Sequence, residues 1–143
     1  YAKENNLPAV CIFEDDVIFC DDLKQRLDYI FANPMPWDMF YLGGYYDDTA
    51  SNINIGDKHI FKVTQMAGTH AYILKASTYD FIIRNITYNY GIDQFYSDIL
   101  IKKYTALAFL PFVAAARPTV SDLTGGKTDY EAHYKQFKKE AIL

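Results

Sequence analysis

The chain has 143 residues and a formal net charge of −4, and half of its side chains are hydrophobic. This length suits one domain with one core, and the hydrophobic content excludes a disordered chain. An acidic chain has no electrostatic reason to follow a phosphate backbone, so we expect no nucleic-acid partner. No apolar stretch is long enough to span a membrane, so no membrane span is expected. Two cysteines, Cys11 and Cys20, imply no disulfide framework and make a reducing compartment the default expectation.

The first predicted elements are a strand, an acidic turn and a helix. Residues 9–13 form a continuous apolar run, which predicts a strand buried on both faces with Cys11 inside. Residues 14–16 are Glu-Asp-Asp, and Asp21 or Asp22 is expected to cap the following helix. Apolar residues at helical spacing should form its inner face: Leu23, Leu27, Ile30 and Phe31. This order of elements is typical of an α/β fold.

Four more strands and three more helices are predicted in the rest of a single domain, 1–143. The strands are expected at residues 38–42, 59–66, 71–74 and 105–110, the first of them stopped by Gly43-Gly44. A helix should start near Ser77, whose spacing to Asp80 matches a capping box, with an apolar stripe of Tyr79, Ile83 and Ile86. Asp93 is expected to cap a second helix, with an inner face of Phe95, Ile99 and Leu100. Residues 45–57 are the longest loop candidate, and residues 127–142 should form an amphipathic tail helix.

Glu14, Asp15 and Asp16 are the strongest candidates for a functional site. Hard cations such as Mg²⁺ and Mn²⁺ prefer oxygen ligands, and carboxylates two residues apart after a strand can converge on one ion. Ligands of open α/β sheets gather at the carboxyl ends of strands, which is where this triplet is expected. Three neighbouring negative charges also repel one another unless a cation is bound. The alternative is structural, since acidic residues after a strand can simply cap the next helix.

The order of the motifs resembles glycosyltransferase family 25. An apolar strand leads into Glu14-Asp15-Asp16, and three further motifs follow in order: Trp37-Asp38-x-x-Tyr41-Leu42-Gly43, Gly68-Thr69-His70-Ala71-Tyr72-Ile73-Leu74 and Asp93-Gln94-Phe95. The resemblance spans roughly residues 8–122, and the family includes lipopolysaccharide and collagen β-galactosyltransferases. It implies a GT-A fold, which is a Rossmann-like mixed α/β sheet flanked by helices. Only about thirteen residues precede the acidic motif, too few for a complete βαβ nucleotide-binding unit, so we expect the fold to be truncated at the N-terminus.

The resemblance also implies a metal, a donor and an acceptor. The donor is expected to be a UDP-sugar carrying galactose or glucose, bound with Mn²⁺ or Mg²⁺, and the acceptor a hydroxyl group of a glycan or a protein. Asp16 is the expected metal ligand together with Glu14, and Glu14 or Asp15 is expected to reach the ribose. The reaction would invert the anomeric centre, and such a step needs a general base.

Further site residues are predicted with a structural alternative for each. Asp93 is the candidate general base or acceptor-binding carboxylate, and a plain helix cap is the simpler role. His70 is a candidate for contact with the donor phosphates or the metal, and a hydrogen-bonded structural histidine is the alternative. Gly43 and Gly44 would let the backbone approach the sugar, or form a tight turn.

Two other functions stay open at this point. A catalytically inactive remnant that binds a sugar or a partner protein is favoured by the short N-terminal part. A metal-dependent phosphohydrolase would use the same carboxylates, but the sequence lacks a second acidic or histidine cluster at ligand spacing. A truncated sheet would also leave an apolar edge that a second copy could cover, so a homo-oligomer is expected, and a strictly monomeric mass would count against it.

Overall fold

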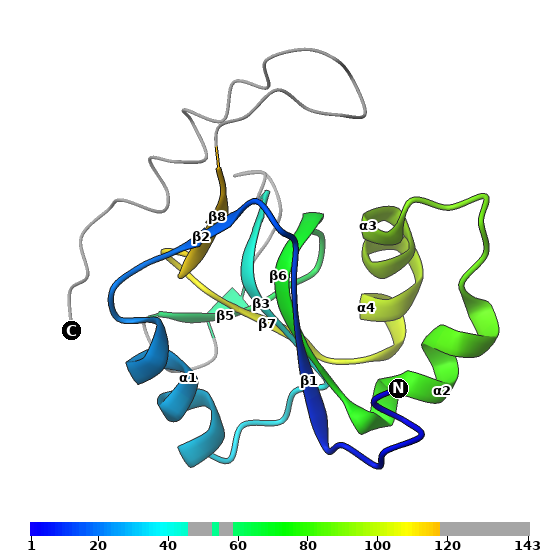
Figure 1. The fold of residues 1–143 in the computed structure, drawn as a ribbon, viewed down its shortest axis with the longest axis horizontal. Helices are drawn as coiled ribbons and strands as arrows, with labels where there is room; N and C mark the ends of the chain where they lie inside the picture. The colour runs from blue at the N-terminus through cyan, green and yellow to red at the C-terminus, as the bar shows by residue number, and fades with distance from the viewer. Residues whose placement is uncertain (46–52, 55–58, 118–143) are drawn as a thin grey trace.

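The computed structural model describes residues 1–45, 53–54 and 59–117, which build one six-stranded sheet and one two-stranded sheet (Figure 1). The larger sheet has the order β1-β6-β3-β7-β5-β4. Its strands are β1 (Ala9–Phe13), β3 (Met39–Tyr45), β4 (Ile53–Asn54), β5 (Ile60–Lys62), β6 (Ala67–Lys75) and β7 (Ala106–Phe109). β3 and β7 are parallel and all other paired strands of this sheet are antiparallel, so the sheet is mixed. β2 (Val17–Phe19) and β8 (Ala114–Ala116) form the smaller sheet.

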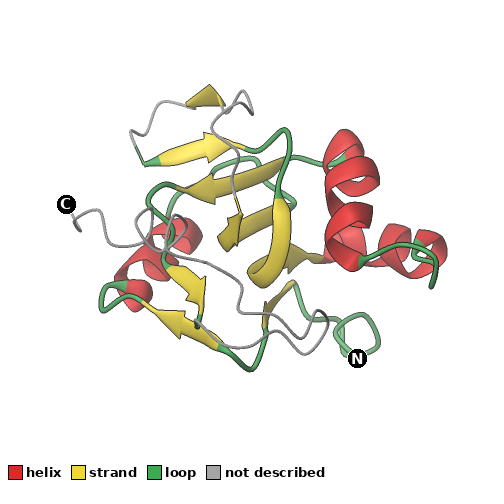
Figure 2. Cartoon of the chain, turned by 90° about the horizontal axis from the view of Figure 1, so that it is seen from above, coloured by secondary structure: helices red, strands yellow, loops and turns green. Residues whose placement is uncertain are grey.

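Helices lie on both sides of the larger sheet (Figures 1 and 2). α1 (Leu23–Ala32) packs on one face. The other face carries α2 (Ala76–Asn85), α3 (Ile92–Phe95), the π-helix η1 (Tyr96–Leu100) and α4 (Ile101–Lys103). The predicted fold class, a Rossmann-like mixed α/β sheet flanked by helices, is therefore confirmed.

Two apolar cores form because the central strands alternate their side chains between the two faces. In β3, Met39 and Tyr41 enter the core on the side of α2 to α4, whereas Phe40 and Leu42 enter the core on the side of α1. All four side chains are fully buried. A strand covered on both faces needs a continuous apolar sequence, which explains the run that predicted it.

The prediction that residues 9–13 are buried on both faces is wrong. β1 is an edge strand whose only partner among the described strands is β6. Val10 and Ile12 pack against the core on the side of α2 to α4, but Cys11 is exposed and the side chain of Phe13 is 42% exposed. An exposed apolar edge of this kind is the feature on which the predicted self-association rests, and that association stays a prediction.

The ends of several strands differ from those predicted. β3 continues through Gly43 and Gly44 to Tyr45, where the sequence predicted a stop. β5 is shorter than the predicted residues 59–66, and β6 is longer than the predicted residues 71–74. β7 lies within the predicted residues 105–110. The predicted tail helix, and most of the predicted 45–57 loop, lie outside the described residues.

The inner face of α1 contains a charged residue that the apolar pattern did not predict. Arg26 is buried, and its Nε donates a hydrogen bond to Asp22 Oδ2 at 2.7 Å. Its guanidinium also donates to the carbonyl oxygen of Pro111 at 3.4 Å, which ties α1 to the segment after β7. Ile30 is buried as expected, whereas the side chain of Phe31 is 58% exposed.

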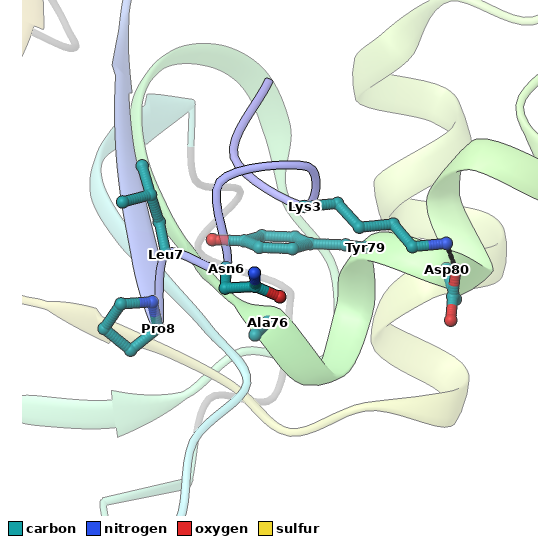
Figure 3. Close-up of a pocket in the computed structure, with 7 residues that line it drawn as sticks. All are labelled: Lys3, Asn6, Leu7, Pro8, Ala76, Tyr79 and Asp80. Carbon is teal, nitrogen blue, oxygen red and sulfur yellow. Dashed lines mark hydrogen bonds and ion pairs between the residues drawn. The ribbon is translucent and has the colours of Figure 1, made fainter.

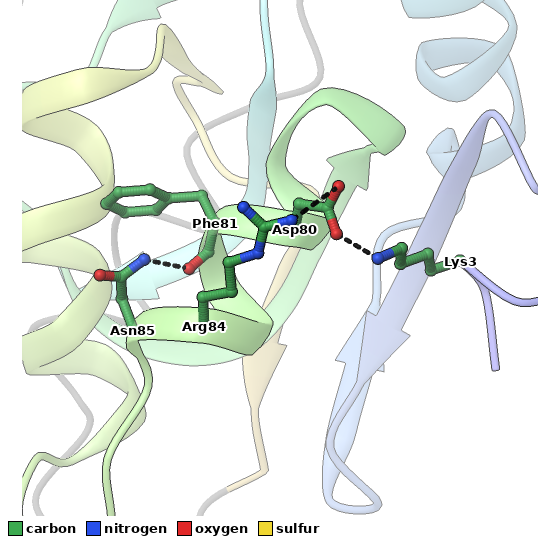
Figure 4. Close-up of polar contacts among 5 residues, drawn as sticks. All are labelled: Lys3, Asp80, Phe81, Arg84 and Asn85. Carbon is green, nitrogen blue, oxygen red and sulfur yellow. Dashed lines mark hydrogen bonds and ion pairs between the residues drawn. The ribbon is translucent and has the colours of Figure 1, made fainter.

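The predicted capping box of α2 does not form. Ser77 lies inside the helix, and its hydroxyl donates to Asp38 Oδ1 at 2.6 Å. Asp80 instead pairs with Lys3 from the N-terminal segment and, at 3.9 Å, with Arg84 one turn later (Figure 4). The contacts with Asp38 and Lys3 join residues far apart in the sequence, so the local spacing could not indicate them, whereas the pair of Asp80 with Arg84 has the ordinary i,i+4 helical spacing.

The buried face of α2 is also rotated from the predicted stripe. Tyr79 is buried as predicted, together with Thr78, which donates to the carbonyl oxygen of Lys75 at 2.8 Å. Ile83 and Ile86 are 61% and 41% exposed. In the next helical segment Phe95 and Leu100 are buried as predicted.

Replacing Phe40 by Ala should lower the free energy of unfolding by about 3–5 kcal/mol, because the deletion leaves a cavity in a core that is fully closed. Phe31→Ala is the matched control, since it removes the same atoms from an exposed side chain and should cost less than about 1 kcal/mol. Urea denaturation of both variants measures the difference. Equal losses in the two variants would contradict the assignment of Phe40 to the core.

Candidate functional site

The acidic triplet is positioned by the pairing of β1 with β6. The two strands are antiparallel from Ala9↔Lys75 to Phe13↔Ala71. Beyond that last pair, the backbone amide of Glu14 donates to the carbonyl oxygen of His70 at 2.9 Å. The hydroxyl of Thr69 donates to Glu14 Oε1 at 3.3 Å. The carboxyl end of β1 and the amino end of β6 therefore hold Glu14 from both its backbone and its side chain.

Asp16 carries a buried carboxylate oxygen that has no hydrogen-bond partner. Its backbone carbonyl accepts a hydrogen bond from the amide of Arg117 at 2.8 Å, next to the pairing of β2 with β8. Its side-chain atom Oδ1 is shielded from solvent and unsatisfied. A buried oxygen without a partner is unfavourable, and more so when it carries charge, unless something positive is bound there. This oxygen therefore suits a cation ligand.

Asp93 lies in the first turn of α3, and the helix cap is Gly91, so the prediction that Asp93 caps the helix is wrong by two residues. Its Oδ1 accepts a hydrogen bond from the backbone amide of Gln94 at 2.8 Å. The side chain is partly exposed, and its negative charge reaches both Glu14 and Tyr41. The fold thus brings Asp93 into the electrostatic surroundings of the triplet, although 77 residues separate it from Asp16.

The charges of three other carboxylates act on Glu14. Burial raises the pKa of the Glu14 carboxyl, and the negative charges of Asp16, Asp15 and Asp93 raise it further, against the hydrogen bond from Thr69, which lowers it. A raised pKa means that the site resists carrying its full negative charge. Clusters of this kind are common where a protein binds a cation or transfers a proton.

The residues fit a metal ion that is shared with a ligand, and they do not form a closed protein cage. Among the described residues, no three histidine, cysteine, aspartate or glutamate side chains are grouped closely enough to hold a metal. Mg²⁺ typically takes one or two protein carboxylates and completes its shell with water and substrate phosphates. The unsatisfied Asp16 Oδ1 is consistent with that arrangement.

His70 lies in β6, which pairs with β1, and Gly43 and Gly44 lie in β3, the next strand of the sheet. His70 is buried in β6, and its ring contacts Tyr45 with 5.4 Å between ring centroids. A Cβ atom on Gly43 would lie 2.5 Å from His70 Nε2 and 2.4 Å from the carbonyl oxygen of Ala114, and a Cβ on Gly44 would meet the Met66 sulfur at 2.7 Å. Both glycines therefore lie inside β3 and do not form a tight turn. Their missing side chains leave room for other atoms of the protein. Contact of these three residues with a donor stays a prediction.

A set of buried tyrosines next to the carboxylates was not predicted. The hydroxyl groups of Tyr72 and Tyr96 lie 3.3 Å apart, and the fully buried Tyr41 has a hydroxyl without a hydrogen-bond partner. Burial raises the pKa of Tyr41, and the charges of Tyr72 and Asp93 add to the effect. The available signal was a tyrosine within each of two apolar strands, where a purely apolar residue would pack as well.

The described cavities lie in two different places. One of about 200 Å³ is lined by Lys3, Asn6, Leu7, Pro8, Ala76, Tyr79 and Asp80, at the amino end of β1 and therefore opposite the triplet (Figure 3). The other, of about 240 Å³, includes Asp93 in its lining. Only the second adjoins the candidate site.

Comparison with known families shows which family the chain belongs to. The family model described as glycosyltransferase family 25 (LPS biosynthesis protein) matches residues 1–101. The chain belongs to glycosyltransferase family 25. The match covers about 70% of the chain and contains every residue predicted for the site, from Glu14 to Asp93. No curated protein matches the sequence.

Family 25 membership makes the chain a transferase of the glycosyltransferase type, with a sugar donor and an acceptor as its ligands. The expected resemblance to this family is confirmed, although the match ends at residue 101 and not near residue 122. No helix among the described residues has the length and apolar character needed to cross a membrane.

Replacing Glu14 by Gln should raise the melting temperature of the family 25 domain at neutral pH in a chelating buffer, because the change removes one of four repelling charges. The pKa of Glu14 is raised from its ordinary value of 4.5, so its contribution to stability is complete below that value and is lost as pH rises through the folded-state pKa. The gain should therefore vanish near pH 4 or below.

Glu4→Gln is the matched control, because Glu4 is 85% exposed and its ion pair within the described part of the chain is with the N-terminal amine at 3.9 Å. Thermal melts of both variants across this pH range provide the measurement. A gain for Glu14→Gln that is no larger than the change for Glu4→Gln, or that persists in acid, would contradict the charge cluster.

Proposed function

We propose that this family 25 chain transfers a hexose, galactose or glucose, from a UDP-sugar to a hydroxyl group of a glycan or protein, with Mn²⁺ or Mg²⁺ held at Asp16 and Glu14. The observation that carries the proposal is the unsatisfied buried Oδ1 of Asp16 within a group of mutually repelling carboxylates. When bound, the cation would offset the charge of the donor diphosphate.

The chain's own residues would supply binding and proton transfer. Asp16 and Glu14 would provide oxygen ligands at the carboxyl end of β1, and Thr69 would orient Glu14 through its hydrogen bond of 3.3 Å. Asp15, which is exposed beside them, would reach the ribose. His70 lies one residue after Thr69 in β6, and its proposed role is contact with the donor phosphates.

Asp93 would act as the general base. In an inverting transfer the acceptor oxygen forms a bond to the anomeric carbon, the bond from that carbon to the diphosphate breaks, and the acceptor proton passes to a base. Asp93 is partly exposed, lines a cavity and lies within electrostatic reach of Glu14. These features support a carboxylate that faces an acceptor on one side and the donor on the other.

A sugar- or partner-binding protein without catalytic activity is the second candidate. In this candidate the buried tyrosines and the cavity next to Asp93 would bind a ligand without taking part in catalysis. This candidate predicts sugar binding without transfer or donor hydrolysis at any metal concentration, so the two candidates differ in turnover.

Asp16→Asn should reduce the affinity for UDP in the presence of Mn²⁺ at least tenfold while the chain stays folded, because the variant loses a charged oxygen ligand. Asp21→Asn, an exposed position after β2, should bind UDP as the unchanged chain does. Isothermal titration with and without Mn²⁺ measures both. Undiminished UDP binding by Asp16→Asn would reject the metal assignment.

Asp93→Asn should lower kcat by about 10²–10⁴-fold while the affinity for UDP changes little, because general-base catalysis contributes that range and the donor is held elsewhere. Asp28→Asn, which removes an exposed carboxylate of α1, is the control and should leave kcat unchanged. Release of UDP from UDP-galactose and UDP-glucose in the presence of an acceptor mixture provides the rate. An unchanged kcat in Asp93→Asn would exclude Asp93 as the base.

A further inference from the structure

The cavity next to Asp93 has a composition suited to one class of ligand. It has a volume of about 240 Å³ and lies between the segment that joins β5 to β6 and the start of α3 and η1. Its seven lining residues are Gln65, Met66, Ala67, Asp93, Gln94, Ser97 and Asp98. Small-molecule sites typically combine an apolar surface with a few convergent polar groups, and this lining has both.

The floor of the cavity is fixed. Met66 is 3% exposed and Ser97 is 9% exposed. The backbone amide of Met66 donates to the Ser97 hydroxyl at 3.4 Å, which ties the β5–β6 segment to the π-helix. A sugar ring has an apolar face of C–H groups, and Ala67, the exposed apolar residue of the lining, offers a small apolar surface for such a face.

The polar lining comes largely from one wide helical segment. Asp93 and Gln94 lie in α3, and Ser97 and Asp98 follow in η1. A π-helix adds a residue to the turn and is frequent at functional sites. Gln94 and Asp98 are exposed, as is Gln65 from the β5–β6 segment, so amide and carboxylate groups are available to a ligand.

The charge of the lining selects between neutral and anionic ligands. Its two charged residues are Asp93 and Asp98, both acidic, and no lysine or arginine is among the seven. Carboxylates accept hydrogen bonds from hydroxyl groups, and side-chain amides both donate and accept them. A phosphorylated or carboxylated sugar would meet like charge, whereas a neutral sugar would not.

We propose that this cavity is the acceptor subsite and that it takes a neutral sugar, with Gln65, Gln94 and Asp98 bonding its hydroxyl groups and Asp93 facing the hydroxyl that reacts. The acceptor role rests on the transferase function proposed above, whereas the preference for a neutral sugar rests on the cavity itself. Asp98 is a specificity-determining residue in this scheme, since its charge excludes anionic sugars.

The test is an NMR titration of the ¹⁵N-labelled chain with neutral methyl hexosides (galactoside, glucoside and mannoside) and with galactose 6-phosphate. At least one methyl hexoside should shift the backbone amides of Gln94 and Asp98, and galactose 6-phosphate should not. Gln94→Ala should weaken that binding about tenfold, the effect of one lost hydrogen bond to a well-placed ligand. Gln25→Ala, an exposed glutamine on α1, is the matched control and should leave it unchanged.

Reversing the charge at residue 98 tests its role in specificity, because a purely structural residue would not change which ligand is preferred. Asp98→Lys should bind galactose 6-phosphate in preference to the methyl hexosides, because the exposed ammonium group would now pair with the phosphate. The proposal is overturned if no methyl hexoside shifts these amides, if the unchanged chain binds galactose 6-phosphate equally well, or if Asp98→Lys leaves the preference as it was.

Titration of the same sample with UDP and Mn²⁺ separates the two proposals. If UDP binds and the hexosides do not, the subsite is wrong and the proposed transferase function stands. If the hexosides bind as described and UDP does not, the transferase function and the acceptor role both fail, and a sugar-binding site is left. Binding of both, each lost in its own variant, supports both.

Discussion

The antiparallel pairing of β1 with β6 is the constraint on which the rest of the site depends. It places the carboxyl end of one strand beside the amino end of the other, and the hydrogen bond from the Glu14 amide to the His70 carbonyl extends the ladder by one step. β6 also pairs with β3 along its other edge, so the site is anchored to the centre of the sheet. Backbone pairing therefore holds Glu14 in place next to the other acidic residues.

The site combines a rigid base with an electrostatically unfavourable surface. β3, the strand next to β6 in the sheet, is buried on both faces from Met39 to Leu42, and Gly43 and Gly44 let the neighbouring chain segments approach closely. Above this base, Glu14, Asp15, Asp16 and Asp93 carry like charges, and one buried oxygen of Asp16 is unsatisfied. Proteins typically keep unpaired charges or unsatisfied polar atoms at functional sites, where a bound ligand can compensate for them. The burial of apolar side chains in the two cores can offset the unfavourable free energy of these carboxylates.

The glycosyltransferase family 25 match and the geometry support each other without overlapping. The match identifies the family over residues 1–101 and says nothing about which atoms meet. In the structure the charge of Asp93 reaches Glu14, and Asp93 also lines a polar cavity. If the proposed donor and acceptor sites are correct, Asp93 would lie between them, and a direct transfer needs the reacting groups to lie next to each other.

The sequence by itself determined the α/β class, the acidic turn after an apolar strand and the family, since each depends on local pattern or motif order. It also indicated strands at residues 38–42 and 105–110, where β3 and β7 lie, although it placed burial on both faces at residues 9–13 instead. Only the tertiary structure decided that β1 lies at an edge, that Arg26 rather than Phe31 faces inward, and that Asp80 pairs with Lys3 in place of capping α2. It also decided that the charge of Asp93 reaches both Glu14 and Tyr41. These outcomes depend on which segments meet across the sheet, and spacing along the chain carries no information about contacts between residues that are far apart in sequence.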